Sequence, residues 1–428
     1  MKSSVIINIS ILLLALFAIP DDAVACRKKI VVSSSLNLVG QFNTNNATYI
    51  IRDEIDLKEI TLTIPDNSNL QFEGGFVKNG IIQGNNTCII AERCALFKSI
   101  IISGSWKNKV VYGEWLDFVE GKKVDNARNF QNLMTLCKGD EMTQLYTKRG
   151  VYYCSVTNGS SNIIVPSNVY WHNSSTICQL PTDSPKSSLV VLHKSNNVTI
   201  DGGEFVGDVK THIGSKGEWG HGIKLAGASN VTLKNFIARE FWGDGIDLIE
   251  ADYVGAINAG VGNCSRINID NVKCLYNRRQ GMSIEAAENV VVKNSEFAYT
   301  GKIAFTAPGT GVDIEPWCRN EHKIFSIYFT NCHFHDNAGG SDFCCISNSQ
   351  YRGTNVKPSV TPRNAIRIKE CKMGRLYVEW VNDVQFSNCD IINIVHYSKG
   401  SKVVFSNNRI KKRALFQTYE GAKFIKNE

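Results

Sequence analysis

The dominant pattern along the chain is a short segment in which apolar and polar residues alternate and which closes on asparagine. Alternation with period two predicts a β-strand with one buried face. The closing Asn can bond neighbouring turn backbone, so stacked copies would form an asparagine ladder. Copies occur at residues 230–235, 267–271, 290–294, 327–331, 384–388 and 403–407, and a leading copy at 197–202 closes on Asp-Gly.

A second strand type lies between these copies and has the pattern Gly-apolar-x-apolar. It occurs at residues 222–225, 245–248, 281–284 and 311–314. One strand of each type per repeat, with no helical period, predicts stacked parallel turns, that is, a β-helix. A sandwich or propeller would need antiparallel hairpins, and the Asn-Gly signals of short hairpins are absent from this region.

The residues before the repeat predict additional elements at the N-terminal end of the coil. Residues 26–112 contain short strands with glycine turns, which predicts a small N-terminal β module. In residues 125–137, the apolar residues Phe130, Leu133, Met134 and Cys137 have helical spacing, with Asp125 as the expected N-cap. A helix lying across the open end of the coil would cover its strand edges. The predicted fold is therefore all-β: a single-stranded right-handed parallel β-helix over residues 113–428, with a short capping helix.

The first residues predict export. Lys2 precedes an apolar run from Val5 to Ile19, and Ala23-Val24-Ala25 offers small residues to a signal peptidase. We expect a signal peptide at 1–25 and a secreted, periplasmic or cell-surface protein. Cys26 directly follows the cleavage site, so an outer-membrane lipid anchor through Cys26 and simple secretion are both open.

Charge and cysteine content narrow the function classes. The net charge of +7 is spread along the chain without a basic cluster, which argues against nucleic acid as a partner. Among the fourteen cysteines, Cys332, Cys371 and Cys389 occupy the same place in successive strands. We expect them to stack as small buried residues. No Cys-x-x-Cys pair occurs, and we predict no metal site.

The Gly-type strands also place acids in columns. The residue between their two apolar positions points outward. Adjacent turns stack about 4.8 Å apart, so Asp247 and Asp313, two turns apart, approach the roughly 6.5–9.5 Å separation of an inverting glycosidase pair. Glu285 and Glu315 would be neighbours on adjacent turns, and like charges that close raise one pKa. We predict a catalytic surface of Asp244, Asp247, Glu285, Asp313 and Glu315; a merely solvated strand face is the alternative.

Other residues beside these strands are candidates for substrate binding. Arg278-Arg279 could hold a carboxylate or sulfate through a planar fork, or could be solvated turn residues. Trp219, Trp242 and Trp317 could stack on sugar rings or pack internally. The predicted binding residues are His221, Lys224, Trp242, Arg278, Arg279 and Trp317.

The chain resembles the pectate-lyase-like superfamily of secreted right-handed parallel β-helix proteins. The resemblance covers the entry into the coil, from Trp115 through Gln131 to Gly150-Val151-Tyr152. Residues 72–75 and 104–106 resemble a leader module found with such coils in gut Bacteroidetes. Gly243-Asp244-Gly245-Ile246-Asp247 resembles the Asn-Thr-Asp-Gly-Ile-Asp motif of polygalacturonases, whose catalytic first Asp falls on Asp244. The next turn carries Arg279-Gln280 where those enzymes have two acids.

The resemblance implies a carbohydrate-active protein with a polysaccharide or oligosaccharide partner. We predict a glycoside hydrolase, on a substrate that could contain uronate, acting through paired carboxylates without a cofactor. One alternative is a polysaccharide lyase with Arg279 or Lys224 as base and calcium held by the acids. The other is a non-catalytic carbohydrate-binding coil.

Overall fold

The computed structural model describes residues 27–34, 37–121, 124–156, 163–251, 262–316, 324–346, 364–398, 401–413 and 422–428. The predicted signal peptide, Cys26 and Trp317 lie outside these residues. Within them, no helix is both long and apolar enough to cross a membrane.

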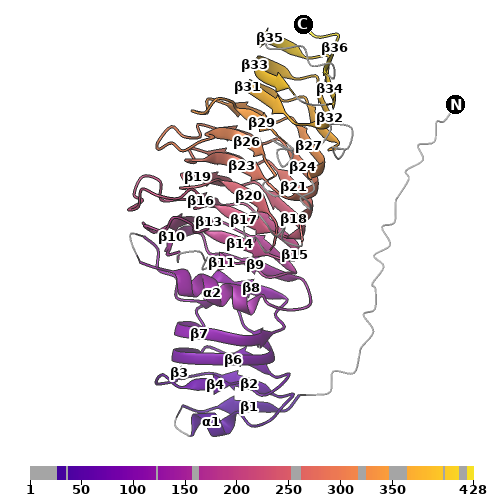
Figure 1. Cartoon of the computed structure of the whole chain (residues 1–428). Coiled ribbons are helices and arrows are strands. Elements are labelled where there is room, and N and C mark those ends of the chain that lie inside the picture. Colours follow the sequence, from indigo (N-terminus) through magenta and orange to yellow (C-terminus); the bar gives the residue numbers. More distant parts are fainter. Residues whose placement is uncertain are drawn as a thin grey trace, which may run out of the picture.

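The main body is the predicted right-handed parallel coil, in which every strand pairs in parallel with the corresponding strand of the next turn (Figure 1). One long sheet carries the Asn-type strands. It contains β8 (Val110–Tyr112), β9 (Thr143–Tyr146), β12 (Val169–His172), β15 (Asn196–Asp201), β18 (Ser229–Lys234), β21 (Cys264–Asp270), β24 (Ala287–Lys293), β27 (Ile324–Thr330), β30 (Ile366–Lys369), β32 (Asn382–Ser387), β34 (Ser401–Ser406) and β36 (Ala422–Ile425).

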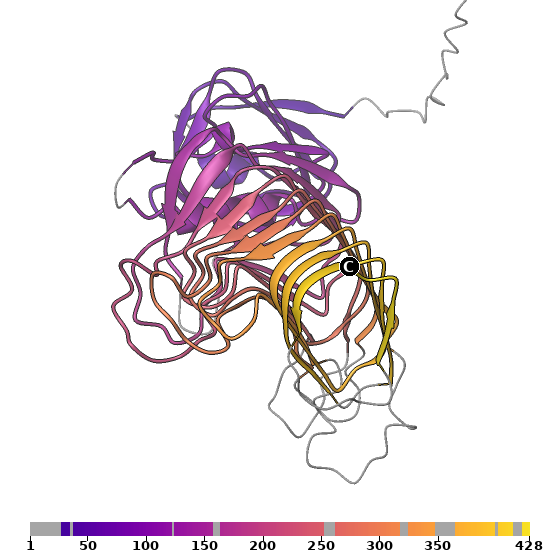
Figure 2. The same ribbon diagram turned by 90° about the horizontal axis from the view of Figure 1, so that it is seen from above.

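The second long sheet carries the Gly-type strands. Seen along the coil, the turns lie over one another, and connecting loops project from the stack (Figure 2). This sheet contains β10 (Gly150–Cys154), β11 (Ile163–Ile164), β13 (Ser175–Gln179), β14 (Val190–His193), β16 (Glu204–Val206), β17 (Ile223–Ala226), β19 (Ile237–Arg239), β20 (Ile246–Ile249), β22 (Lys273–Leu275), β23 (Gln280–Ile284), β25 (Glu296–Ala298), β26 (Thr310–Ile314), β28 (His333–His335), β29 (Phe343–Cys345), β31 (Lys372–Glu379), β33 (Asp390–Ser398) and β35 (Arg409–Arg413).

The N-terminal module is itself built from parallel strands. It consists of α1 (Leu38–Gln41), β1 (Lys29–Val32), β2 (Thr48–Ile51), β3 (Glu54–Asp56), β4 (Thr61–Thr63), β5 (Asn69–Phe72), β6 (Phe76–Ile90) and β7 (Phe97–Trp106). β8 falls in the range predicted for the module, yet it pairs with β9 of the coil. A 3₁₀ turn at Gly113–Trp115 follows it.

The predicted capping helix is α2 (Ala127–Leu136), which lies between the module and the first turns of the coil (Figure 1). It buries Phe130, Leu133 and Met134 against β7 and β11. The expected N-cap is wrong by one residue, because Asn126 holds that position. Asp125 still serves the helix start, since its Oδ1 accepts the Ala127 N–H at 2.9 Å.

The asparagine ladder forms at the turn after each Asn-type strand. Asn235, Asn271, Asn294 and Asn331 all have φ between 51° and 61°, a left-handed conformation that Asn tolerates better than most residues. Asn271 Nδ2 donates to Asn235 Oδ1 at 3.0 Å, and Asn331 Nδ2 donates to Asn294 Oδ1 at 2.8 Å. Between these two pairs the partner changes: Asn294 Nδ2 donates to Asp270 Oδ1 at 2.8 Å rather than to an asparagine.

The cysteine stack lies on the inner side of the same turns. Cys332, Cys371 and Cys389 are buried and free. The Cys332 N–H points to Cys371 Sγ at 3.4 Å, so the column fills the core with compact side chains in contact.

The ladder can contribute to stability in two ways, through the left-handed backbone conformation and through the side-chain hydrogen bond. Replacing Asn271 separates the two. We expect Asn271→Ala to lower the free energy of unfolding by about 1–2 kcal/mol, because Ala must adopt a left-handed conformation. Asn271→Gly should recover part of that loss, since Gly adopts positive φ freely. Urea unfolding monitored by circular dichroism measures both. Equal losses for Ala and Gly would assign the effect to the side-chain bond alone.

Candidate active site

The strand register brings the predicted columns together. Lys224 pairs with Asp247, Asp247 with Ser283, and Ser283 with Asp313, on successive turns through β17, β20, β23 and β26. The backbone N–H of Glu285 bonds to Leu248 O at 2.9 Å, and that of Glu315 bonds to Ile284 O at 3.0 Å. The predicted acids therefore lie on three consecutive turns of one sheet.

The expectation that these acids face solvent is wrong for Asp244, Asp247 and Asp313, whereas Glu285 and Glu315 are half-buried. Every residue of β20, β23 and β26 is buried, and Asp247 and Asp313 are only 1% and 2% exposed. The alternation of apolar and polar residues gives the direction in which a side chain points, but not whether other residues pack over it. Here His221 and Arg279, from segments leading into the strands, pack over the acids.

Arg279 is the centre of the cluster. Its Nη1 lies 3.0 Å from Asp244 Oδ2, its Nη2 lies 2.7 Å from Glu315 Oε1, and its Nε lies 3.6 Å from Glu218 Oε2. Burial opposes the charge of Arg279, but these carboxylates outweigh burial and raise its pKa well above the ordinary value. These contacts favour the cationic form of Arg279, and its use as a lyase base stays a prediction.

Three polar residues that the sequence reasoning did not assign complete the network. Ser283 Oγ donates to Asp244 Oδ2 at 2.6 Å and also contacts Gln280. Gln280 Nε2 donates to Glu315 Oε1 at 2.7 Å and to Asp313 Oδ2 at 3.3 Å. Glu218 joins through Arg279. The strand repeat places Ser283 and Gln280 beside the acids, so the sequence could have found these two. It could not have found Glu218, which lies in a loop without a repeat.

Asp244 is held in its ionised form. Burial raises its pKa, but Arg279 and His221 lower it more, and the net shift is downward. His221 joins the two aspartates, because its Nδ1 lies 3.3 Å from Asp244 Oδ2 and its Nε2 lies 3.6 Å from Asp247 Oδ2. Lys224 Nζ lies 3.9 Å from the same oxygen of Asp247.

Glu285, Asp313 and Glu315 have raised pKa values. Burial and the charge of Asp247 raise the pKa of Glu285 well above its ordinary range. Burial and the charge of Glu315 do the same for Asp313. The pKa of Glu315 rises through burial despite Arg279, and that of buried Glu250 rises through burial and Asp247. The cluster thus combines a carboxyl with a lowered pKa and carboxyls with raised pKa values.

The predicted binding residues fall into two groups. His221, Lys224 and Arg279 belong to the cluster. Trp242 and Arg278 do not face it: Trp242 is 8% exposed, stacks on His212 at 3.8 Å, and carries the Arg278 guanidinium at 3.8 Å from its ring centre. Arg278 Nη1 donates to Gly217 O at 2.8 Å. Both are structural contacts, which side-chain type alone could not distinguish from ligand contacts.

Among the described residues, no three His, Cys, Asp or Glu side chains have an arrangement that could hold a metal ion. The acids are instead bonded to Arg279, Gln280 and Ser283. A calcium site for the lyase alternative would require these contacts to be exchanged for the ion.

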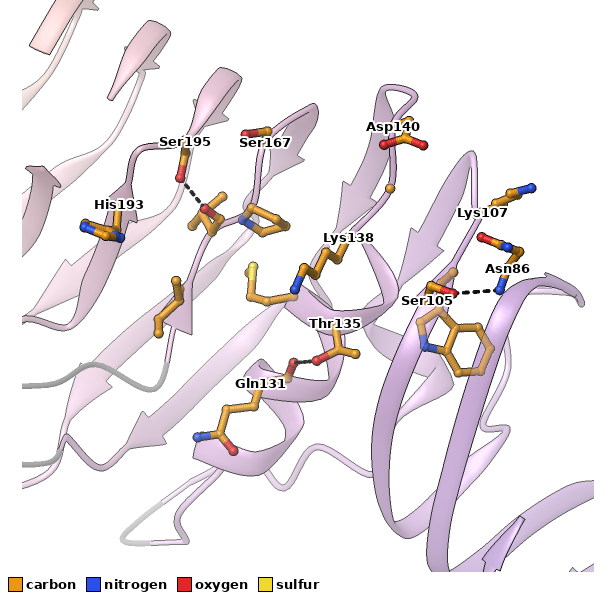
Figure 3. Close-up of a pocket in the computed structure, with 16 residues that line it drawn as sticks. Asn86, Ser105, Lys107, Gln131, Thr135, Lys138, Asp140, Ser167, His193 and Ser195 are labelled. Atoms are coloured by element: carbon orange, nitrogen blue, oxygen red, sulfur yellow. Dashed lines mark hydrogen bonds between the residues drawn. The ribbon is translucent and has the colours of Figure 1, made fainter. Parts of the chain in front are cut away.

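A cleft of about 660 Å³ lies away from the acid cluster, where α2 meets the module and the first turns of the coil (Figure 3). Its lining combines Lys107 and Lys138 with polar residues such as Gln131 and Ser167. Asp140 is the one carboxylate among its lining residues in the described chain. A single acid cannot supply the paired acid and base of a glycosidase, so the buried cluster is the better candidate active site.

No family model matches the chain. Two proteins of Bacillus subtilis are similar to it in sequence: the uncharacterized protein YclG, 26% identical over 238 residues, and the SPbeta prophage-derived protein YorA, 24% identical over 157 residues. The match with YclG spans 51% of this chain and 40% of that protein, and the match with YorA spans 34% and 27%. The chain thus spans less than half the length of either relative.

Similar solved structures include ORF18 of Geobacillus virus E2 (TM-score 0.49, 13% identity, 75% of this chain and 60% of that chain), the A-module of mannuronan C-5 epimerase AlgE4 from Azotobacter vinelandii (0.48, 12%, 74% and 94%) and pectate lyase Pel9A (0.37, 12%, 65% and 63%). At these identities the similarity concerns the fold alone. The predicted parallel β-helix is confirmed by the strand pairing of successive turns.

The raised pKa values predict a distinctive dependence of stability on pH. Acids whose pKa is raised on folding stabilise the protein below their ordinary pKa, and that contribution is lost as pH rises through the raised value. Asp244, with a lowered pKa, acts in the opposite sense at low pH. The free energy of unfolding should therefore fall above the ordinary carboxyl range, and Glu285→Gln should flatten this fall because Gln cannot ionise.

Urea unfolding across a pH series tests this expectation. Glu288→Gln, on β24 of the opposite sheet, is the matched control and should follow the wild type. If the free energy of unfolding of Glu285→Gln falls with pH as steeply as that of the wild type, Glu285 ionises normally.

Proposed function

We propose that the chain is an exported glycoside hydrolase that cleaves a polysaccharide through Asp247 on β20, Glu285 directly after β23 and Asp313 on β26. The observation that carries the proposal is one packed cluster of acids whose pKa values are shifted in opposite directions, because an inverting or retaining glycosidase needs a protonated and an ionised acid at neutral pH. A solvated strand face, the alternative reading, would not have buried these groups or shifted their pKa values in opposite directions.

Glu285 is the proposed general acid. Its raised pKa keeps a proton available, and it retains partial exposure while the column beneath it is buried. The leaving glycosidic oxygen takes this proton as its bond to the anomeric carbon breaks. Asp247, whose charge raises the pKa of Glu285, is the proposed base for the attacking water, with His221 and Lys224 beside it.

Lys224 favours a substrate that carries carboxylates. Lys224 has a side chain 29% exposed, so its ammonium can meet a group from solvent. Arg279 is 11% exposed and already bonded to carboxylates, so it positions the acids. We therefore propose a uronate-containing polysaccharide as the substrate.

A polysaccharide lyase is the second candidate, because the side chain of Lys224 is 29% exposed and could reach a substrate proton, whereas Arg279 is engaged by carboxylates. A lyase would remove the proton beside a uronate carboxyl and leave an unsaturated sugar. The two reactions differ in their products, so one assay separates them.

Incubation with polygalacturonate, alginate and a neutral β-glucan, reading reducing ends and ultraviolet absorbance together, tests the proposal. We expect new reducing ends without unsaturated product. Glu285→Gln, Asp247→Asn and Asp313→Asn should each lower the rate by about 10²- to 10⁴-fold, the usual effect of losing a positioned acid or base. Glu288→Gln is the control. Wild-type rates in all three variants would place the reaction elsewhere, and absorbance appearing with the reducing ends would favour the lyase.

We also propose export through the first 25 residues, with Cys26 as the first mature residue. If Cys26 carries lipid, the protein expressed in a Gram-negative host should sediment with membranes, and Cys26→Ser should move it to the soluble fraction. Immunoblots of the separated fractions measure this. A wild-type protein found wholly in the soluble fraction would indicate simple secretion instead.

A further inference from the structure

Two loops beside the acid cluster expose large apolar side chains. The loop between β16 and β17 exposes Ile213 (73%) and Trp219 (51%), and the loop between β25 and β26 exposes Ile303 (39%) and Phe305 (54%). Single exposed apolar residues are ordinary on protein surfaces, whereas a gathering beside a polar site marks a binding surface. The connecting loops project from the stacked turns in Figure 2.

Both aromatic residues follow or precede a residue that contacts Arg278 or Arg279. Glu218, the neighbour of Trp219, lies 3.6 Å from Arg279 Nε. Thr306, the neighbour of Phe305, donates its N–H to Arg278 O at 3.4 Å. Arg278 and Arg279 are consecutive, so the loops of the two aromatic residues meet the segment that leads into β23, the strand between Asp247 and Asp313.

The first loop is held rigidly. Buried Asp208 Oδ2 lies 2.8 Å from His212 Nδ1, and His212 stacks on Trp242. Arg278 covers Trp242 and bonds to Gly217 O, while Trp242 Nε1 donates to Lys216 O at 3.3 Å. The backbone of Trp219 itself is bonded on both sides, because its N–H donates to Pro185 O at 3.3 Å and its O accepts from Ser187 at 3.1 Å.

Phe305 has a fixed ring as well. It packs against Gly301 and Gly309, which have φ of 74° and 68°. A Cβ at Gly301 would come within 2.8 Å of Phe305 Cδ2, so glycine is needed for the ring to settle there. An exposed aromatic ring that is already immobilised loses little entropy when a ligand stacks on it.

We infer that Trp219 and Phe305 are two sugar-binding platforms spaced across the turns that carry the acid cluster. This inference deepens the proposed function and rests on it. Trp219 precedes β17 and Phe305 precedes β26, which lie three pairing steps apart, or about 14 Å at roughly 4.8 Å per step. Such a span fits an oligosaccharide stretch of a polymer, with apolar sugar faces on the rings and the scissile bond between them.

Affinity electrophoresis of the full chain in gels containing polygalacturonate, alginate or a neutral β-glucan tests the inference. We expect Trp219→Ala and Phe305→Ala each to weaken retardation by the binding polysaccharide about tenfold. Trp219→Phe should restore most of it, because Phe keeps a stacking face. Phe325→Ala, which removes a ring 41% exposed on β27 of the opposite sheet, is the matched control.

The same variants are then assayed on long and short oligosaccharides of that polymer. Loss of a platform should raise KM for long substrates and leave the shortest cleavable substrate nearly unchanged. Undiminished retardation of both Ala variants overturns the platforms while the proposed hydrolysis stands. Retardation and cleavage absent in the wild type with every polymer would overturn the proposed function and the inference together. A wild-type dimer that both Ala variants dissociate, seen by sedimentation, would assign the patch to self-association and also overturn the inference.

Discussion

The parallel register of the turns is the constraint on which the rest of the structure depends. Each strand repeats the hydrogen bonds of the strand below it, so a residue at one position must lie against its counterpart one turn away. The chain meets this constraint with side chains that gain from stacking. Asparagines bond to one another at the left-handed turns, and Cys332, Cys371 and Cys389 fill a narrow part of the core.

Acids are the exception, because stacking carboxylates brings like charges together in a buried place. Arg279 resolves part of this conflict by contacting Asp244 and Glu315 at once, and its aliphatic stem leaves it only 11% exposed. Burial, and after it the charge of neighbouring carboxylates, raises the pKa values of Glu285 and Asp313. Asp244, which contacts Arg279 directly, has a lowered pKa instead.

The sequence shows which residues stack on successive turns, but not which residues pack over them. Period-two alternation and the repeated glycine were enough to predict the fold, the neighbours Asp247, Ser283 and Asp313, and the shared turns of Glu285 and Glu315. The burial of these residues could not be predicted, since it depends on loops without a repeat, which deliver Glu218, His221 and Arg279. The same limit explains Trp242 and Arg278, whose partners His212 and Gly217 belong to such a loop. The predicted boundary at residue 112 stays a prediction, although β8 already pairs with the coil.

The energetic cost of the cluster favours function over mere structure. Elsewhere in the coil, inward positions are apolar and outward positions of the Asn-type strands are exposed to water, so neither carries a desolvation cost. Asp247 on β20 and Asp313 on β26 stand at outward positions and yet are buried, and burying an ion costs several kcal/mol unless it is fully paired. The Oδ1 atoms of Asp244 and Asp247 are buried without a hydrogen-bond partner among the described residues. A coil selected for stability alone would fill this column with apolar or small residues, as it does at Ser283 and Cys344. Carboxylates kept there at a cost to folding are what a site for proton transfer requires.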